Sequence, residues 1–267
     1  MKKVLSLVLV LTVFAAMAMG SGSSKSKSTV GTASATAAQD SKAAENAGAE
    51  STTEATTTEA EIKYEVTDTQ FSYYKNSIND IEYYGFVEIE NTGNTYLYLS
   101  DCTFDLEDND GHLLQSDDFI SKCPDVIAPG EKGYFYNGLG SNLIDDGVSL
   151  ENGVKLVPQF KVEICNKGAD AIVEYEVSDA SMKEGTYGPK VTGRVTNSTD
   201  KDCSYLYIDI LFLGEDGKVI ALTGTSITGL DAGVTKSFDC DCMFVNEEIK
   251  DAIKDFRIIA RDDYMQF

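Results

Sequence analysis

The stretch Tyr96-Leu-Tyr-Leu99 recurs later in the chain as Tyr205-Leu-Tyr-Ile208, and this recurrence determines the predicted architecture. Chance similarity does not keep six matches in the same order, so we predict two copies of one domain, spanning residues 62–168 and 169–267. The five further matches, at nearly equal spacing, are residues 64–68 with 175–179, 89–92 with 195–198, 110–111 with 216–217, 127–130 with 230–233, and 160–162 with 256–258.

Each copy is predicted to consist of β-strands, because apolar and polar residues alternate over short segments that end in turn residues. Residues 83–91 and 96–106 are two such strands, and Val87 and Ile89 fall on one face of the first. Several short antiparallel strands in each copy predict an all-β fold with two tandem immunoglobulin-like β-sandwich domains. In the second copy, alternation places four apolar side chains on one face of a strand: Leu206, Ile208, Ile210 and Phe212.

One short helix is predicted near the end of the second copy. Asn246 is a favourable N-cap residue, and the helix is expected to lead into the last strand. The apolar residues after the cap follow the helical spacing i, i+3, i+4 and i+7, and they are Ile249, Ala252, Ile253 and Phe256.

The segment Phe104-Asp-Leu106-Glu107-Asp108, directly before Asn-Asp-Gly, resembles the FxLYD motif, with Glu107 at the tyrosine position. A strand ending in asparagine precedes it and an Ile-x-x-Gly turn follows, as in the FxLYD domains of exported bacterial proteins. The second copy departs further, because Gly214-Glu215 replaces the Tyr-Asp end. The resemblance implies an extracytoplasmic β-sandwich module, often found on lipoproteins, and it implies no catalytic residues.

Residues 1–20 are typical of an export signal, with Lys2 and Lys3 before an apolar run and a small-x-small cleavage pattern. The apolar run is shorter than the roughly 20 residues that a membrane-spanning helix needs. Residues 18–24 resemble a bacterial lipoprotein signal in which Ser21 replaces the cysteine that receives the lipid. Since serine cannot form the thioether, the chain as written is not expected to carry the lipid, and membrane attachment is expected only through an N-terminal anchor. Three explanations of Ser21 stay open: a secreted relative of lipoproteins, a sequence variant, or an engineered Cys→Ser change.

Residues 21–61 are predicted to form a disordered linker. Nearly every residue there is Ser, Thr, Ala, Gly, Lys or Glu, and Val30 is the only large aliphatic one. Such a segment cannot bury enough apolar surface to offset the entropy lost on ordering. Its composition suits a flexible spacer, although a disordered leader without a role has the same composition.

The charge and the histidine content exclude several classes of function. The chain has 44 acidic and 22 basic residues, a net charge of −22, and one histidine. Nucleic-acid phosphates and anionic lipids repel such a chain, so no nucleic-acid partner is predicted. A single histidine leaves little room for imidazole catalysis or for a multi-histidine metal site. We predict no catalytic residue, no cofactor and no metal ligand.

The six cysteines occupy different positions in the two copies, which argues against a shared disulfide framework. Export permits disulfides, and we favour a Cys102–Cys123 bridge together with a bridge from Cys203 to Cys240 or Cys242. Cys102 could instead be a small buried apolar residue. The spacing of Cys240 and Cys242 lacks the second ligand pair of a zinc site.

The acidic turn at residues 105–111 suggests calcium binding at first sight. A calcium loop needs an acid or amide where Leu106 lies, and no glutamate closes the loop downstream. The acidic residues are therefore interpreted as turn formers with solvated charge. His112, which follows the turn, is interpreted as an exposed residue at a strand start rather than a ligand-binding or pH-sensitive group.

Tyrosines give the best indication of binding. Tyr96 and Tyr98 alternate with leucines, so they are a candidate ligand face on the outside of a strand. Exposed aromatic rings stack on sugars or anchor a protein partner. The alternative is ordinary strand propensity, because tyrosine suits a half-buried sheet surface.

Together these features predict an exported protein, at the cell surface or secreted, with a non-enzymatic binding role at the bacterial envelope. Its expected partner is an envelope protein or glycan. One alternative is a structural spacer or stalk. Another is an envelope enzyme that acts on carbohydrates through paired carboxylates, which the lack of long loops disfavours.

Overall fold

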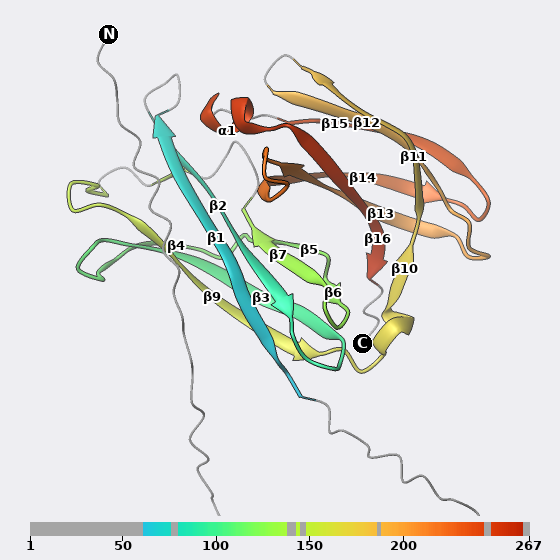
Figure 1. Ribbon diagram of the computed structural model, residues 1–267, viewed down its shortest axis with the longest axis horizontal. Coiled ribbons are helices and arrows are strands. Elements are labelled where there is room, and N and C mark those ends of the chain that lie inside the picture. Colours follow the sequence, from blue (N-terminus) through green and yellow to red (C-terminus); the bar gives the residue numbers. More distant parts are fainter. Residues whose placement is uncertain are drawn as a thin grey trace, which may run out of the picture. The chain divides into compact units, whose positions relative to one another are not determined.

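Figure 1 shows the computed structural model of the protein. The structure describes residues 61–75, 80–137, 143–144, 148–185, 188–242 and 247–263, which belong to one compact unit. The predicted signal peptide, the linker up to residue 60 and Asn246 lie outside these described residues. Within them, no helix has both the length and the apolar character needed to cross a bilayer.

The described chain is mostly β, as the alternating pattern predicts. The first half, residues 61–167, contains β1 (Tyr64–Lys75), β2 (Ile81–Asn91), β3 (Leu97–Glu107), β4 (Leu113–Asp117), β5 (Ser121–Cys123), β6 (Val126–Ile127), β7 (Lys132–Tyr136), β8 (Leu143–Ile144) and β9 (Lys155–Ile164). The second half, residues 168–263, contains the 3₁₀-helix η1 (Gly168–Ala171), β10 (Ile172–Glu174), β11 (Glu176–Glu184), β12 (Pro189–Thr196), β13 (Cys203–Leu213), β14 (Val219–Leu230), β15 (Thr235–Asp241), α1 (Glu247–Ala252) and β16 (Asp255–Asp263).

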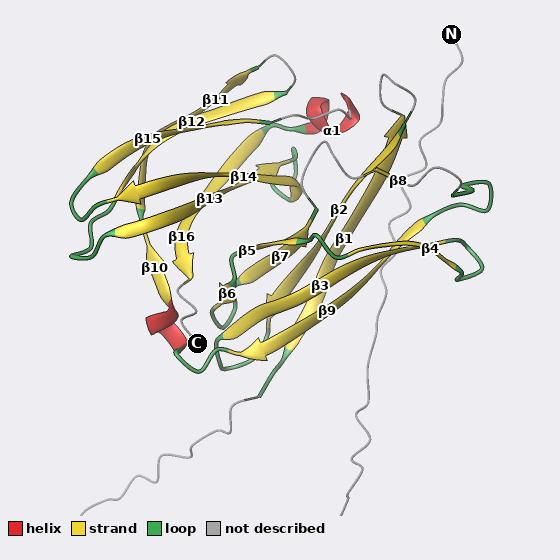
Figure 2. Cartoon of the chain, turned by 180° about the vertical axis from the view of Figure 1, so that it is seen from behind, coloured by secondary structure: helices red, strands yellow, loops and turns green. Residues whose placement is uncertain are grey.

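Two antiparallel sheets pack face to face in the first half (Figure 2). One has the strand order β1-β2-β7-β5, with β8 also paired to β2. The other is built around β3, which pairs with β4, β6 and β9. Val87 and Ile89 lie between the sheets and are fully buried, which confirms that they share the core face.

The second half also has two antiparallel sheets, with the orders β10-β16-β13-β14 and β11-β12-β15. Both contribute to one apolar cluster, in which Val191 and Val195 of β12 lie with the apolar face of β13. The predicted alternation in β13 is confirmed, because its four inward side chains are fully buried: Leu206, Ile208, Ile210 and Phe212.

The same strand arrangement occurs in both halves. The order β1-β2-β7 corresponds to β11-β12-β15, and β3 between β9 and β4 corresponds to β13 between β16 and β14. An identical turn follows the second strand of each half. Asn91 Nδ2 donates to the carbonyls of Thr95 and Ile127, and Asn197 Nδ2 donates to those of Lys201 and Leu230. The repeated sequence segments therefore occupy matching places in the two halves.

The helix prediction is confirmed at Glu247–Ala252 but is wrong beyond it, because Phe256 lies in β16. The backbone NH of Ile253 still donates to the Lys250 carbonyl. The next backbone NH, that of Lys254, donates to the Leu213 carbonyl at the end of β13 instead. Pairing with β13 therefore ends the helix before its apolar pattern ends.

The two halves contact each other through the outer face of the β1-β2-β7-β5 sheet. Tyr84 and Phe86 of β2 point away from the first-half core and join the apolar cluster of the second half, so β2 is buried on both faces. Tyr136 Oη donates to Asp209 Oδ1 at 3.1 Å. Arg261 Nη1 donates to Glu131 Oε1 at 2.7 Å.

The corresponding sheet of the second half presents a polar face instead. By the register of the repeat, Phe86 corresponds to Thr192, and Tyr134 corresponds to Ser237. Ser237 is exposed, whereas Tyr134 is buried. The outer face of a sheet is therefore apolar where another sheet covers it, and polar where it is exposed to solvent.

Candidate functional site

A half-open hollow of about 360 Å³ lies between the segment around β5 in the first half and the outer face of strands β13 and β16 in the second half. We call it the tyrosine hollow. The segment around β5 contributes Ile120, Ser121, Lys122, Pro124 and Asp125. Strands β13 and β16 contribute Tyr205, Tyr207, Asp209, Ile259, Arg261 and Asp262.

Tyr205 and Tyr207 are the most exposed residues of the lining, although their rings are large and mostly apolar. They are 54% and 41% exposed, and their ring centroids lie 6.5 Å apart. They occupy alternate positions of β13, opposite Thr228 and Ser226 of β14, so both rings stand on the same face of the sheet. Further along that face, Asp209 and Leu211 are covered by the first half and are buried. The rings therefore form an aromatic surface at the place where this cover stops.

The phenol of Tyr207 stays protonated at neutral pH. Burial, and then the nearby Asp209 carboxylate, raise the pKa of Tyr207 above its ordinary value. A neutral phenol both donates and accepts a hydrogen bond. The ring can thus offer a polar edge as well as an apolar face.

Both cations at the hollow are held by groups of the protein. Lys122 Nζ donates to Tyr98 Oη and to the Ser100 carbonyl, each at 3.2 Å. The Arg261 side chain is only 5% exposed, and it donates to Glu131 and to the Val126 carbonyl. These donors therefore serve the structure rather than a ligand. The lining carboxylates have protein partners as well, because Tyr136 Oη donates to Asp209 and Lys122 Nζ lies 3.9 Å from Asp125 Oδ1.

The tyrosine pair singled out from the sequence lies elsewhere. Tyr96 and Tyr98 are half-buried and pack against the cluster of Val126, Cys165 and Ala171. Lys122 Nζ lies 4.7 Å from the centroid of the Tyr98 ring. Neither tyrosine lines the tyrosine hollow.

Tyr205 and Tyr207 were not predicted from the sequence as site residues, although they form the matching motif of the second copy. The Tyr-x-Tyr alternation was a usable signal for an outward pair in either copy. The alternation could not show which of the two tyrosine pairs is partly covered by a neighbouring segment. That depends on packing between elements far apart in the sequence.

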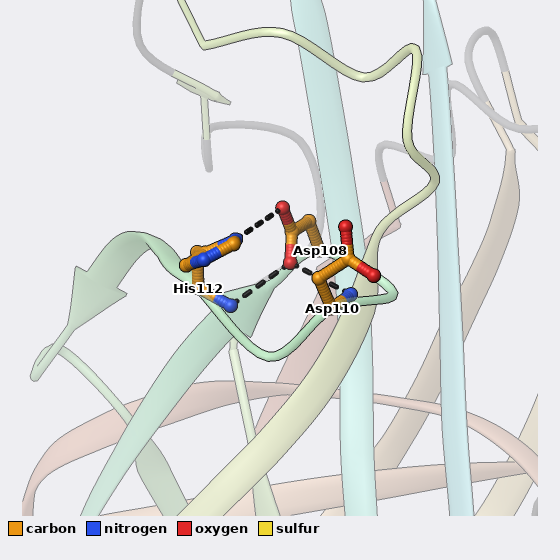
Figure 3. Close-up of side chains that lie close together, drawn as sticks. All are labelled: Asp108, Asp110 and His112. Atoms are coloured by element: carbon orange, nitrogen blue, oxygen red, sulfur yellow. Dashed lines mark hydrogen bonds and ion pairs between the residues drawn. The ribbon is translucent and has the colours of Figure 1, made fainter.

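The acidic turn between β3 and β4 brings three potential metal ligands together. Ligand atoms of Asp108, Asp110 and His112 all lie within 4.8 Å of one another (Figure 3). Asp108 Oδ1 accepts hydrogen bonds from the backbone NH groups of Asp110 and His112, both at 2.9 Å. Its other oxygen lies 3.0 Å from His112 Nδ1.

These hydrogen bonds stabilise the turn itself. Asn152 Nδ2 also donates to Asp108 and Asp110, at 3.2 and 2.8 Å. The backbone NH of His112, then its ring, hold the pKa of Asp108 well below its usual range. N–H groups thus donate to the Asp108 carboxylate oxygens that a cation would need as ligands. The Asp108 side chain stabilises the turn in the manner of an Asx-turn.

The structure brings neither predicted cysteine pair together, and all six cysteines are thiols in it. Cys123 belongs to the cluster on the outer face of the first-half sheet, whereas Cys102 packs against the cluster on its inner face. Cys203 lies opposite Leu230 at one end of β14, whereas the thiol of Cys240 donates to the Gly224 carbonyl, six residues along that strand. A disulfide needs Cα atoms within about 7 Å, and six strand residues span about 20 Å.

Cys240, on the buried face of β15, and Cys242, directly after the end of that strand, influence each other. The hydrogen bond from the Cys242 thiol lowers the pKa of Cys240 and raises that of Cys242. Both residues are at most 5% exposed. Their thiols are therefore closed to solvent in the folded chain.

Comparison with models of known protein families finds no match to this chain, and a search of curated proteins finds none either.

Proposed function

We propose that this chain is an exported, non-enzymatic binding protein of the bacterial cell envelope, with the tyrosine hollow as its ligand site. The observation that carries the proposal is the pair of exposed rings, Tyr205 and Tyr207, in the lining of that hollow. Large aromatic side chains at a concave surface are the groups that contribute most to binding energy. Export, at the cell surface or into the medium, rests on the signal-like residues 1–20.

The finer architecture belongs to the same proposal. We infer two tandem immunoglobulin-like domains of the FxLYD kind, at residues 62–168 and 169–267. The recurring strand order and the matching turns at Asn91 and Asn197 support this inference. The FxLYD resemblance implies no catalytic residues, which suits a binding role.

The proposal is tested by retention of envelope material on the immobilised full chain. Solubilised envelope proteins and cell-wall glycans are passed over it separately, and retained molecules are identified by mass spectrometry. We expect retention that is lost when Tyr205→Ala and Tyr207→Ala are combined. The control is Tyr96→Ala, in the other copy of the motif and outside the hollow, and it should retain the ligand.

Two results would contradict the proposed site. Loss of retention in the Tyr96→Ala variant alone would move the ligand face to the first half. Retention of nothing from either pool would favour the second candidate function, a structural spacer. The burial of both faces of β2 supports that candidate, since it fixes the two halves to each other.

A further inference from the structure

We infer that Cys240 and Cys242 form a redox-active pair, which closes to a disulfide by exchange with a small-molecule disulfide and is easily reduced again. Neither cysteine lines the tyrosine hollow, so this inference does not depend on the proposed binding function. It rests on three features: the spacing of the two thiols, the contacts of the Cys240 sulfur, and the seam between two sheets in which the pair lies.

The spacing of the two cysteines lies at the limit of what a disulfide spans. Cys240 pairs with Val191 of β12, and two residues further the backbone NH of Cys242 donates to the Pro189 carbonyl at 3.1 Å. The chain is therefore extended from Cys240 to Cys242, and both side chains join the buried cluster of the second half. Two residues of extended chain span about 6.4–6.8 Å, whereas the Cα atoms of a disulfide are usually about 4.4–6.8 Å apart. A disulfide between these residues therefore forms only under strain.

The Cys242 side chain turns back towards Cys240. Its thiol donates to the Cys240 carbonyl oxygen, which lies 3.9 Å from the Cys242 sulfur. A hydrogen bond from the Cys242 thiol, opposed by burial and supported by a hydrogen bond from Thr223, lowers the pKa of Cys240. Cys240 is thus the thiol that becomes the attacking thiolate more readily, and Cys242 lies beside it as the second thiol.

Exchange with a disulfide R–S–S–R takes two steps at this pair. The Cys240 thiolate attacks one sulfur and expels R–S⁻, which takes up the proton that Cys240 released. The Cys242 thiolate then attacks the Cys240 sulfur of the mixed disulfide and expels the second R–S⁻, which takes up the proton of Cys242. The pair thereby loses two protons and two electrons, and the oxidant becomes two R–SH.

The pair lies in the seam between the two sheets of the second half. Strand β14 is at the edge of one sheet and β15 at the edge of the other, and among the described residues no ladder joins the two strands. Side chains cross the seam instead. The Cys240 thiol donates to the Gly224 carbonyl at 3.5 Å, and Lys236 Nζ donates to the Thr228 carbonyl at 2.9 Å. The seam can therefore part without breaking a ladder, which gives an oxidant access to thiols that are buried in the closed fold.

The fold disfavours the closed disulfide. Cys240 loses the hydrogen that it donates to the Gly224 carbonyl, and this partly buried acceptor is left without that donor. Because folding disfavours the disulfide, the folded chain also reduces it more easily, as is typical of strained disulfides. The pair is therefore suited to reversible oxidation rather than to a permanent cross-link.

The test follows the pair in the folded full chain by mass spectrometry. The chain is incubated with glutathione disulfide, its remaining thiols are alkylated in urea, and it is cut with trypsin. Cleavage after Lys236 and Lys250 leaves both cysteines in the peptide 237–250. We expect this peptide to be lighter by two hydrogens and to carry no alkyl group. Cys203, a buried single thiol of the same half, should be alkylated as before.

The ease of reduction is measured in mixtures of glutathione and glutathione disulfide. A synthetic peptide of residues 237–250 provides the same two cysteines without the fold. In one and the same mixture, the ratio of disulfide to dithiol should be lower in the folded chain by about tenfold or more, because only the fold strains the bond. Oxidation should correspondingly lower the urea midpoint of the chain.

Variants assign the reaction to the pair. Cys240→Ser and Cys242→Ser should each abolish closure, and the matched control Cys203→Ser should leave it unchanged. Urea unfolding identifies any variant that fails to fold. In that case the peptide map of the unchanged chain still decides, because peptide 237–250 holds both cysteines.

Three outcomes would overturn the inference. In the first, both thiols are still alkylated after incubation with glutathione disulfide. In the second, glutathione stays attached to one cysteine and the pair does not close. In the third, the disulfide is as hard to reduce in the folded chain as in the peptide, or harder, which is the behaviour of a structural cross-link. None of these outcomes bears on retention of envelope material through Tyr205 and Tyr207.

Discussion

Asp108 shows how one side chain can organise a turn that sequence patterns alone describe as acidic and exposed. Its carboxylate accepts from two backbone NH groups and faces the His112 ring and the Asn152 amide. All four contacts favour the charged form of the carboxylate. The turn between β3 and β4 therefore depends on the ionisation of this one group.

The stability of the chain should depend on pH through Asp108. Its pKa is about 3.9 in an unfolded chain and is lowered in the folded state. The stabilisation is thus present above about pH 4 and is lost as the pH falls towards the folded value. Urea midpoints measured from about pH 2 to pH 7 should fall less steeply below pH 4 for Asp108→Asn than for the unchanged chain.

Asp216→Asn is the control for this measurement. Asp216 lies in the matching turn of the second half, where its Oδ1 accepts one backbone hydrogen bond, from Lys218. Its substitution should leave the acid slope nearly unchanged. Parallel slopes for the unchanged chain and Asp108→Asn would contradict the assigned role of Asp108.

At the scale of elements, β2 is the strand whose two faces have different partners. Its odd-numbered residues face the first-half core, and Tyr84 and Phe86 face the second half. Alternation does not describe such a strand, because both faces carry apolar residues. The run of consecutive apolar residues at 83–87 indicates a strand that is buried on both faces.

Removing a side chain from the outer face of β2 should cost as much as removing one from the core. Phe86 is fully buried, so Phe86→Ala should lower the free energy of unfolding by about 3–5 kcal/mol. Ser237→Ala, on the exposed face of the corresponding sheet, should change it by less than about 0.5 kcal/mol. Urea unfolding of both variants provides the comparison, and a small effect of Phe86→Ala would mean that the two halves do not pack there.

The strands were predictable from the sequence because each depends on a local pattern. The alternation at residues 206–212 and the matching Asp-Gly turns needed no knowledge of distant contacts. The end of α1 was not predictable, because pairing of Lys254 with Leu213 decides it. The tyrosine hollow was not predictable for the same reason, since residues of β5 and β13 meet there only after folding.

At the scale of the whole described unit, one apolar cluster extends through both halves. It contains Phe86 and Tyr136 of the first half together with Leu211 and Phe212 of the second. Two bodies that share buried side chains should unfold together rather than in turn. The contact is completed by Arg261, whose side chain is nearly closed to solvent.

We therefore expect a single unfolding transition for the folded part of the chain. Calorimetric and van't Hoff enthalpies should agree in differential scanning calorimetry. Arg261→Gln removes the charge that pairs with Glu131, so it should lower the free energy of unfolding by about 1–3 kcal/mol. Lys218→Gln, at an exposed ion pair with Asp216, is the matched control and should have little effect. Two well-separated transitions in the unchanged chain would show that the halves fold independently.

The long pairing of β1 with β2 has a mechanical consequence. The two strands run antiparallel from Tyr64 opposite Asn91 to Lys75 opposite Ile81, and β1 is the first element of the described part of the chain. Tension applied at residue 61 along the strand direction loads all of these hydrogen bonds in shear at the same moment. Tension applied across the strands would break them one after another. The fold should therefore resist a pull along β1 better than a pull at right angles to it.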